Sequence, residues 1–169
     1  QKGCVYVPHV VALQVGQTLE LVNSDTTTHN VHALSDINKT FNESMPIPGM
    51  RLKKSFDDAE ILKLKCQVHP WMSAWVGGFE HPFFAVTAAD GSFRISGLPA
   101  GTYTVSAVHE IYGEKTAEVT VGDGEADGLE QFEAGVDVGQ PGEPSSTRAG
   151  PVGEIVAIEV SAEHQVGVS

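Results

Sequence analysis

The heptapeptide CQVHPWM, residues 66–72, directly follows the run ILKLK at residues 61–65. Alternating apolar and polar side chains are typical of a strand with one buried face, so we expect Cys66 at the end of a strand. The heptapeptide spaces a thiol, an imidazole and a thioether as C-x2-H-x2-M, which is short enough for one loop to wrap a single ion. The sequence therefore predicts a β-strand that leads into a metal-binding loop.

The composition of the chain favours an all-β fold. Of its 169 residues, 41% are hydrophobic, which is enough for a real core, and Gly and Pro occupy 18 and 9 positions. Abundant Val and Thr with frequent turn residues favour short strands over helices. Two strands joined at Gly16 and Gln17 are expected within residues 5–21, and strand-like composition resumes at residues 26–34. Later strand-like runs lie at residues 83–87, 92–96, 102–110 and 114–121.

A formal charge of −12, from 10 Lys and Arg against 22 Asp and Glu, makes the chain strongly acidic. Nucleic-acid binding requires a clustered basic face, and this chain has only short Lys pairs, so no nucleic-acid partner is expected. A docking partner is expected to be basic instead. No apolar stretch approaches the roughly 20 residues that span a bilayer, and no signal peptide is visible, so we expect a chain that does not span a membrane.

The fourth metal donor has to come from elsewhere in the chain. One thiolate and two imidazoles in a trigonal arrangement, with a weak thioether on the axis, suit a copper ion that alternates between Cu(II) and Cu(I). His29 is the best candidate for the second imidazole, because it follows a strand and a Thr-rich turn. Asn30 beside it can brace the loop by side-chain hydrogen bonding.

Two segments, THNVH at residues 28–32 and CQVHPWM at residues 66–72, resemble the ligand segments of the cupredoxins, particularly of the amicyanin and plastocyanin branch. In amicyanin these segments are H-N-V-H and C-x-x-H-P-F-M. The resemblance implies a single type 1 (blue) copper ion and a Greek-key sandwich of eight strands over roughly residues 5–78. It implies the following roles: His29, Cys66 and His69 as equatorial ligands, Met72 as the axial ligand, and His32 outside the ligand set.

The second half of the chain resembles a different family. The segment DGSFRISGLPAGTYTVSAVHE, residues 90–110, is similar to the carboxypeptidase regulatory-like (transthyretin-like) β-sandwich. We therefore expect an all-β chain, in which a Greek-key cupredoxin β-sandwich is extended by a small regulatory-like β-meander. The expected domains are a cupredoxin-like domain at residues 1–82, a regulatory-like segment at 83–122, and an acidic Gly/Pro-rich linker with a strand-like tail at 123–169.

The cupredoxin resemblance implies a one-electron carrier in the periplasm or outside the cell. The electron enters at the exposed edge of His69 and passes to a redox protein, such as a c-type cytochrome or a membrane electron-transfer complex. Trp71 serves either for loop packing or as part of an apolar docking patch around His69. No G-x-S-x-G elbow, P-loop or H-E-x-x-H motif occurs, so no enzyme activity is expected.

Other interpretations of the two cysteines stay open at this point. Extracytoplasmic proteins with two cysteines usually pair them, so the alternative of a different class is a non-redox secreted β-sandwich with a Cys4–Cys66 disulfide, acting as a binding or structural subunit of a larger assembly. Cys4 could also be an extra ligand, and the protein could store or deliver copper. Zinc on two Cys and two His is disfavoured, because a thioether is a poor zinc donor and the spacing of structural fingers is absent.

Overall fold

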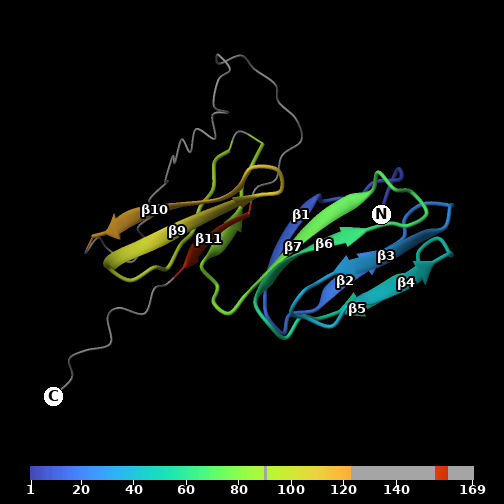
Figure 1. Ribbon diagram of the computed structural model, residues 1–169, viewed down its shortest axis with the longest axis horizontal. Helices are drawn as coiled ribbons and strands as arrows, with labels where there is room; N and C mark the ends of the chain where they lie inside the picture. The colour runs from blue at the N-terminus through green and yellow to red at the C-terminus, as the bar shows by residue number, and fades with distance from the viewer. Residues whose placement is uncertain (90, 123–154, 160–169) are drawn as a thin grey trace, which may run out of the picture. The chain divides into compact units, whose positions relative to one another are not determined.

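The computed structural model describes residues 1–89, 91–122 and 155–159. The chain forms two compact units, one from Gln1 to Pro82 and a second that begins at Phe83. Strands β1 to β7 belong to the first unit and β8 to β11 to the second (Figure 1). The described residues contain strands and turns without a helix, which confirms the all-β class. None of these residues forms an apolar helix long enough to cross a bilayer.

The first unit contains a five-stranded sheet and a two-stranded sheet. The larger sheet has the order β1 (Val10–Gln14), β7 (Ser73–Phe79), β6 (Glu60–Lys65), β3 (His29–Leu34) and β4 (Phe41–Met45). Only β1 and β7 pair in parallel within it. The smaller sheet pairs β2 (Leu19–Val22) with β5 (Arg51–Lys54) in antiparallel fashion. Both sheets contribute side chains to one core, so the unit is a β-sandwich.

The start of the chain differs from the sequence expectation. Residues 5–21 do contain two strands joined around Gly16, which has a φ of +80°. However, the described part of the first unit has seven strands instead of the eight implied by the resemblance, because the first strand begins only at Val10. Residues 3–9 form bends, and Pro8 among them has no N–H to donate to a sheet.

The alternating pattern of β6 and β7 fixes the position of the ligand loop. Leu62 and Leu64 are each 2% exposed, and they point into the core from β6. Lys65 of β6 pairs with Ser73 of β7, so the seven residues between them are the whole connection between two antiparallel strands. The predicted strand ending at Cys66 is confirmed to within one residue.

The second unit is a four-stranded antiparallel sheet with the order β10, β9, β11 and β8. Its strands are β8 (Phe84–Val86), β9 (Gly101–His109), β10 (Gly113–Val121) and β11 (Ile155–Glu159). Part of the strand-like tail pairs with the sheet, where β11 lies between β8 and β9 (Figure 1). The rest of the expected linker and tail, residues 123–154 and 160–169, lies outside the described residues.

One strand expected in the second unit is not formed. Residues 92–96 are irregular, although their composition is strand-like. Ile95 in this segment is buried and packs against Phe93 and Tyr103, so its apolar side chain serves a small core without joining the sheet. Burial alone therefore accounts for the apolar character of this stretch.

Candidate metal centre

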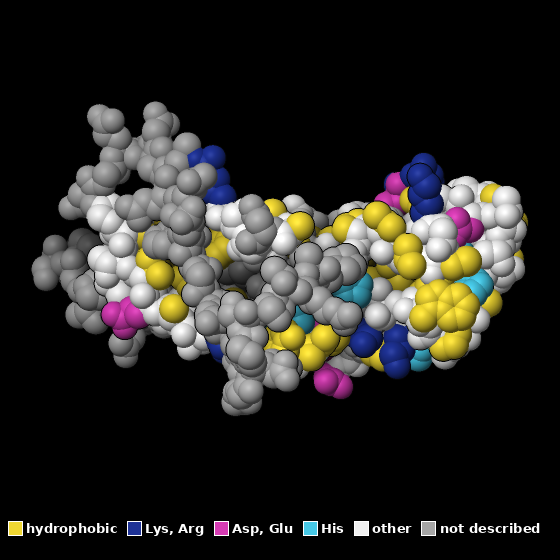
Figure 2. All heavy atoms as spheres, turned by 90° about the horizontal axis from the view of Figure 1, so that it is seen from above, with side chains coloured by type: hydrophobic (Ala, Val, Ile, Leu, Met, Phe, Trp, Pro, Cys, Tyr) yellow, Lys and Arg dark blue, Asp and Glu magenta, His cyan; other side chains and the backbone are white. Residues whose placement is uncertain are grey.

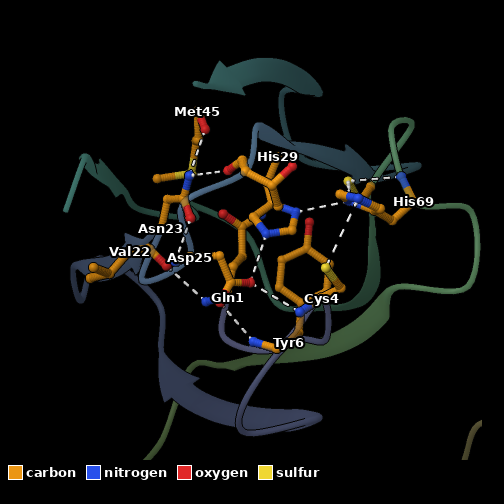
Figure 3. A network of polar contacts seen from close by, with 12 residues as sticks. Gln1, Cys4, Tyr6, Val22, Asn23, Asp25, His29, Met45 and His69 are labelled. Atoms are coloured by element: carbon orange, nitrogen blue, oxygen red, sulfur yellow. Dashed lines mark hydrogen bonds and ion pairs between the residues drawn. The ribbon is translucent and has the colours of Figure 1, made fainter. Parts of the chain in front are cut away.

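The predicted donors gather at one end of the larger sheet of the first unit. His32 of β3 pairs with Lys65 of β6, so the start of β3 lies beside the residues that continue from β6 into the loop. His29 is the first residue of β3, and Cys66 and His69 belong to the loop. Figure 3 shows the His29 and His69 rings facing each other. The register thus brings two distant sequence segments to a single place.

Backbone hydrogen bonds close the ligand loop on itself. The N–H of Cys66 donates to the carbonyl of Met72 at 3.2 Å, and the N–H of Met72 donates to the carbonyl of His69 at 2.9 Å. The N–H of His69 donates to Cys66 Sγ at 3.4 Å. Because a thiolate accepts such a bond better than a thiol, this contact favours the metal-binding form of Cys66.

His29 is fully buried and is oriented by a carboxylate. Its Nε2 lies 2.9 Å from Asp25 Oδ2, which also accepts the N–H of Cys4 at 2.9 Å, while Oδ1 accepts the N–H of Gly3 at 2.7 Å. The bonds from Cys4 and Gly3, followed by the one from His29, lower the pKa of Asp25 to about 2. An ionised carboxylate only accepts hydrogen bonds, so Nε2 of His29 donates to it, and in a neutral ring this leaves the lone pair on Nδ1.

Two of the predicted donor atoms lie close to His69 Nδ1. His29 Nδ1 lies 3.0 Å from His69 Nδ1, and Cys66 Sγ lies 3.9 Å from the same His69 nitrogen. Metal bonds of about 2.0 Å to nitrogen and about 2.3 Å to sulfur, at roughly 120°, separate such donors by roughly 3.5 and 3.7 Å. The two observed separations differ from these values by about 0.5 and about 0.2 Å, so the rings would have to shift for the two nitrogens and the sulfur to bind one metal ion in a trigonal arrangement.

The axial donor has weaker structural support than the other three. Met72 is 1% exposed and ends the loop that holds Cys66 and His69. Its assignment as a ligand rests on the spacing and on the resemblance. It stays a prediction.

Asn30 connects β3 to the ligand loop, as the sequence suggested. Its Oδ1 accepts the N–H of Gln67, and its Nδ2 donates to Asn42 Oδ1 at 2.6 Å. The carbonyl of Asn30 accepts the Tyr6 hydroxyl at 2.8 Å. Burial raises the pKa of Tyr6 to about 12, with a further contribution from nearby Cys66, so the phenol stays neutral and donates. Asn30 therefore braces the loop at its first residues.

Cys4 lies at the same site but is not bonded to Cys66. Both cysteines are free, so the disulfide of the alternative hypothesis is not formed in the structure. The two thiols face different nitrogens of one imidazole: Cys4 Sγ is 4.0 Å from His69 Nε2, whereas Cys66 Sγ is near Nδ1. Ligand atoms of Cys4, His29 and His69 all lie within 4.8 Å of one another. This makes Cys4 a full member of the cluster.

An aromatic side chain covers the outer edge of the site. The ring centroid of Trp71 lies 5.2 Å from that of His69, and Trp71 Nε1 donates to the carbonyl of Cys4 at 3.0 Å. Trp71 is 67% exposed and Val68 in the same loop is 49% exposed. Figure 2 shows hydrophobic side chains at the surface of the first unit directly beside histidine atoms. The site thus has an apolar, accessible face.

Comparison with known proteins returns two families. Residues 77–133 match the family model for the carboxypeptidase regulatory-like domain. A purple cupredoxin from Nitrosopumilus maritimus is 26% identical, with a TM-score of 0.40 over 46% of this chain and 85% of that chain. These are the two families whose motifs the sequence resembles.

Two amicyanin structures also match the chain. A variant in the Cu(I) form is 22% identical, with a TM-score of 0.35 over 44% of this chain and 72% of that chain. A variant in the reduced state is 23% identical, with a TM-score of 0.33 over 41% of this chain and 69% of that chain. No curated protein sequence matches the chain.

Sequence reasoning missed one residue of the site. Asp25 is not among the site residues that the sequence predicts. Its position four residues before His29 was the available signal, because metal-binding histidines commonly donate their second nitrogen to a carboxylate. The spacing becomes informative only once His29 is known to begin a strand.

Proposed function

We propose that the first unit is a type 1 copper protein that carries single electrons between redox partners in the periplasm or outside the cell. The spacing of His29 Nδ1, His69 Nδ1 and Cys66 Sγ supports this most directly. Met72 is the proposed axial ligand. When bound, copper would supply the one-electron couple between Cu(II) and Cu(I), for which two imidazoles, a thiolate and a weak thioether are suited.

The surrounding residues hold the donors in place for both oxidation states. Asp25 fixes the ring of His29, and Asn30 fixes the loop at Gln67. A scaffold that limits ligand movement lowers the structural cost of gaining or losing an electron. The hydrogen bond from the N–H of His69 to Cys66 Sγ withdraws charge from the sulfur and thereby tunes the reduction potential.

Electron exchange would take place at the His69 edge beneath Trp71. The exposed apolar face around Trp71 can exclude water when a partner docks, which brings the partner's redox centre close to the imidazole. A c-type cytochrome or a membrane electron-transfer complex is the proposed partner. The formal charge of −12 favours a partner with a basic docking face. The proposed role is that of a carrier and not of an enzyme.

Visible absorption of the copper-loaded protein tests the proposed centre. The full chain loaded with one equivalent of Cu(II) should show an intense thiolate-to-copper band, which Cys66→Ser should abolish. Val68→Ala changes an exposed residue of the same loop and serves as the matched control, with the band retained. Stoichiometric copper in the wild type without such a band contradicts the type 1 assignment.

The axial assignment has its own test. Met72→Leu preserves side-chain volume, so folding should be affected by less than about 1.5 kcal/mol. Loss of the thioether should raise the copper reduction potential, because the axial ligand tunes the couple. Met50→Leu removes a thioether elsewhere in the unit and is the control for voltammetry. Equal potentials in Met72→Leu and the wild type would exclude Met72 as a ligand.

Electron exchange separates a carrier from a copper store. Stopped-flow mixing of the Cu(I) protein with an oxidised c-type cytochrome should give rapid electron exchange that reverses with the opposite starting states. The rate should decrease with ionic strength, since a basic partner is attracted to an acidic protein. A blue protein that exchanges no electrons supports storage or delivery instead.

A further inference from the structure

Cys4 is held by both ligand segments of the proposed copper site. Its N–H donates to Asp25, the same carboxylate that binds His29, and its carbonyl accepts the indole N–H of Trp71 in the ligand loop. Its φ of +55° lies in the left-handed region, which residues other than Gly rarely adopt. Two independent hydrogen bonds thus fix an unusual backbone conformation that directs the thiol toward His69 (Figure 3).

The hydrogen bonds of His29 and His69 also bear on which nitrogen of the His69 ring can bind a metal ion first. Nδ1 of His29 keeps a lone pair, because Nε2 of that ring donates to Asp25. A hydrogen bond between the two Nδ1 atoms, which lie 3.0 Å apart, would place a proton on His69 Nδ1. That tautomer of His69 has its lone pair on Nε2, the atom that faces Cys4 Sγ. In this tautomer the outer side of the ring can bind an ion before the inner side.

The distance between these two outer donors suits a particular ion. Cys4 Sγ and His69 Nε2 are 4.0 Å apart. An ion bonded to sulfur at about 2.3 Å and to nitrogen at about 2.0 Å in a nearly straight line needs a separation of roughly 4.3 Å or slightly less. Cu(I) accepts two donors in a line and prefers soft sulfur, whereas zinc in structural sites takes four donors. The pair therefore fits Cu(I).

We propose that Cys4 Sγ and His69 Nε2 form a capture site, at which incoming Cu(I) binds before it passes to His29, Cys66, His69 and Met72. We call these four residues the inner site, and this inference rests on their proposed function. On capture, the Cys4 thiol loses its proton to water as the Cu–S bond forms. A ring nitrogen of His29 lies within 4.8 Å of Cys4 Sγ and of a ring nitrogen of His69, so His29 can accept the ion during the transfer.

Bonds, protons and electrons all balance in the transfer of Cu(I) to the inner site, so no redox partner is needed. The Cu–S bond to Cys4 breaks as bonds to His29 Nδ1, His69 Nδ1 and Cys66 Sγ form. The proton of the Cys66 thiol leaves to solvent and Cys4 takes one up. The proton on His69 Nδ1 is likewise released, and Nε2 takes one up. Copper stays Cu(I) throughout, and loading as a whole releases one proton.

The capture site can be tested in a protein that lacks the inner thiolate. Full-length Cys66→Ser, reduced and kept anaerobic, is titrated with Cu(I) against a coloured Cu(I) chelator. It should hold one equivalent at least tenfold more tightly than Cys4→Ser/Cys66→Ser. X-ray absorption of the Cu(I)-loaded Cys66→Ser protein should show one sulfur and one nitrogen at bonding distance. Equal Cu(I) affinities in the two variants would overturn the proposal.

Loading kinetics test the order of events. Cu(I) uptake is followed as loss of colour from the Cu(I)–chelator complex after mixing with apo-protein. Cys4→Ser should load at least tenfold more slowly than the wild type. Val5→Ser, which introduces serine at the neighbouring exposed position, should load at the wild-type rate. A wild-type rate in Cys4→Ser would show that copper enters by another route.

The two proposals fail in different experiments. A wild-type protein without the visible Cu(II) band, combined with Cu(I) capture by Cys66→Ser, would overturn the electron carrier and leave the capture site standing. A wild-type protein with the band, combined with no capture by Cys66→Ser, would overturn only the capture site.

Discussion

Asp25 Oδ2 lies 2.9 Å from Nε2 of His29, and this carboxylate joins the N-terminal segment to the proposed copper site. The same oxygen accepts the N–H of Cys4, so the carboxylate fixes an imidazole and a thiol at once. Because Asp25 stays ionised down to a pKa of about 2, the contact persists across the physiological pH range. The orientation of His29 therefore depends on a residue outside the ligand set.

Asp25→Asn should weaken copper binding by about tenfold or more, which is the usual cost of losing a partner of a metal-binding histidine. An amide has one acceptor oxygen and no charge, so it cannot serve His29, Cys4 and Gly3 together. Loss of the negative charge should also raise the reduction potential. Competition titration and voltammetry measure both effects, and Asp36→Asn at an exposed position is the control. Unchanged affinity and potential would mean that Asp25 only holds the N-terminal segment.

Asn30→Ala should lower the free energy of unfolding of the metal-free protein by about 1 to 3 kcal/mol, because it leaves the partners of a buried amide unsatisfied. Asn30 is 7% exposed, and its side chain joins Gln67 to Asn42. Urea unfolding measures the loss. Asn42→Ala removes the bonds to Asn30 Nδ2 and to Gln67 Oε1 but keeps the bond from the Gln67 N–H to Asn30, so it should cost less. A loss as large as that of Asn30→Ala would argue against bracing of the loop by Asn30.

Most of the proposed ligand set is local in the sequence. Cys66, His69 and Met72 occupy one loop of seven residues, and the alternating strand before it fixes where the loop begins. His29 could be proposed only from its position after a strand and a Thr-rich turn and from a resemblance, since its approach to His69 depends on the register between β3 and β6. No local pattern encodes such a register.

Other features of the fold arise from contacts between distant segments. The insertion of β11 between β8 and β9 joins strands separated by a long connection. The position of Cys4 depends on bonds to residues 21 and 67 positions away along the chain. Sequence reasoning could identify Cys4 as important, but the choice between a disulfide and a separate donor required its distance from His69.

Glu60→Gln should destabilise the protein at neutral pH, with a difference from the wild type that disappears in acid. Burial acts to raise the pKa of Glu60, but hydrogen bonds from Ser35, Asn38 and the N–H of Asp36 outweigh it and lower the pKa to about 2. A depressed carboxyl pKa contributes stability above the unfolded value of roughly 4.3, and this stability is lost as the pH falls toward 2.

Urea unfolding of the metal-free protein at pH 7, 4 and 2 measures this effect. The difference between wild type and Glu60→Gln should be about 1 kcal/mol or less at pH 7, since the site is partly exposed, and close to zero at pH 2. Asp57→Asn, at an exposed position, provides the comparison. A difference that stays constant across the three pH values would show that the carboxyl's ionisation is not involved.

Trp71→Ala should slow electron exchange with a c-type cytochrome by about tenfold or more, while Trp71→Phe should slow it far less. The indole lies 5.2 Å from the His69 ring and is 67% exposed, so truncation removes the largest apolar contact available to a partner. Phe keeps an aromatic face over His69 but loses the N–H that binds the Cys4 carbonyl. Stopped-flow rates at several salt concentrations compare the two variants. Equal slowing in both would assign the effect to the lost hydrogen bond and the position of Cys4, whereas wild-type rates in both would place the docking face elsewhere on the protein.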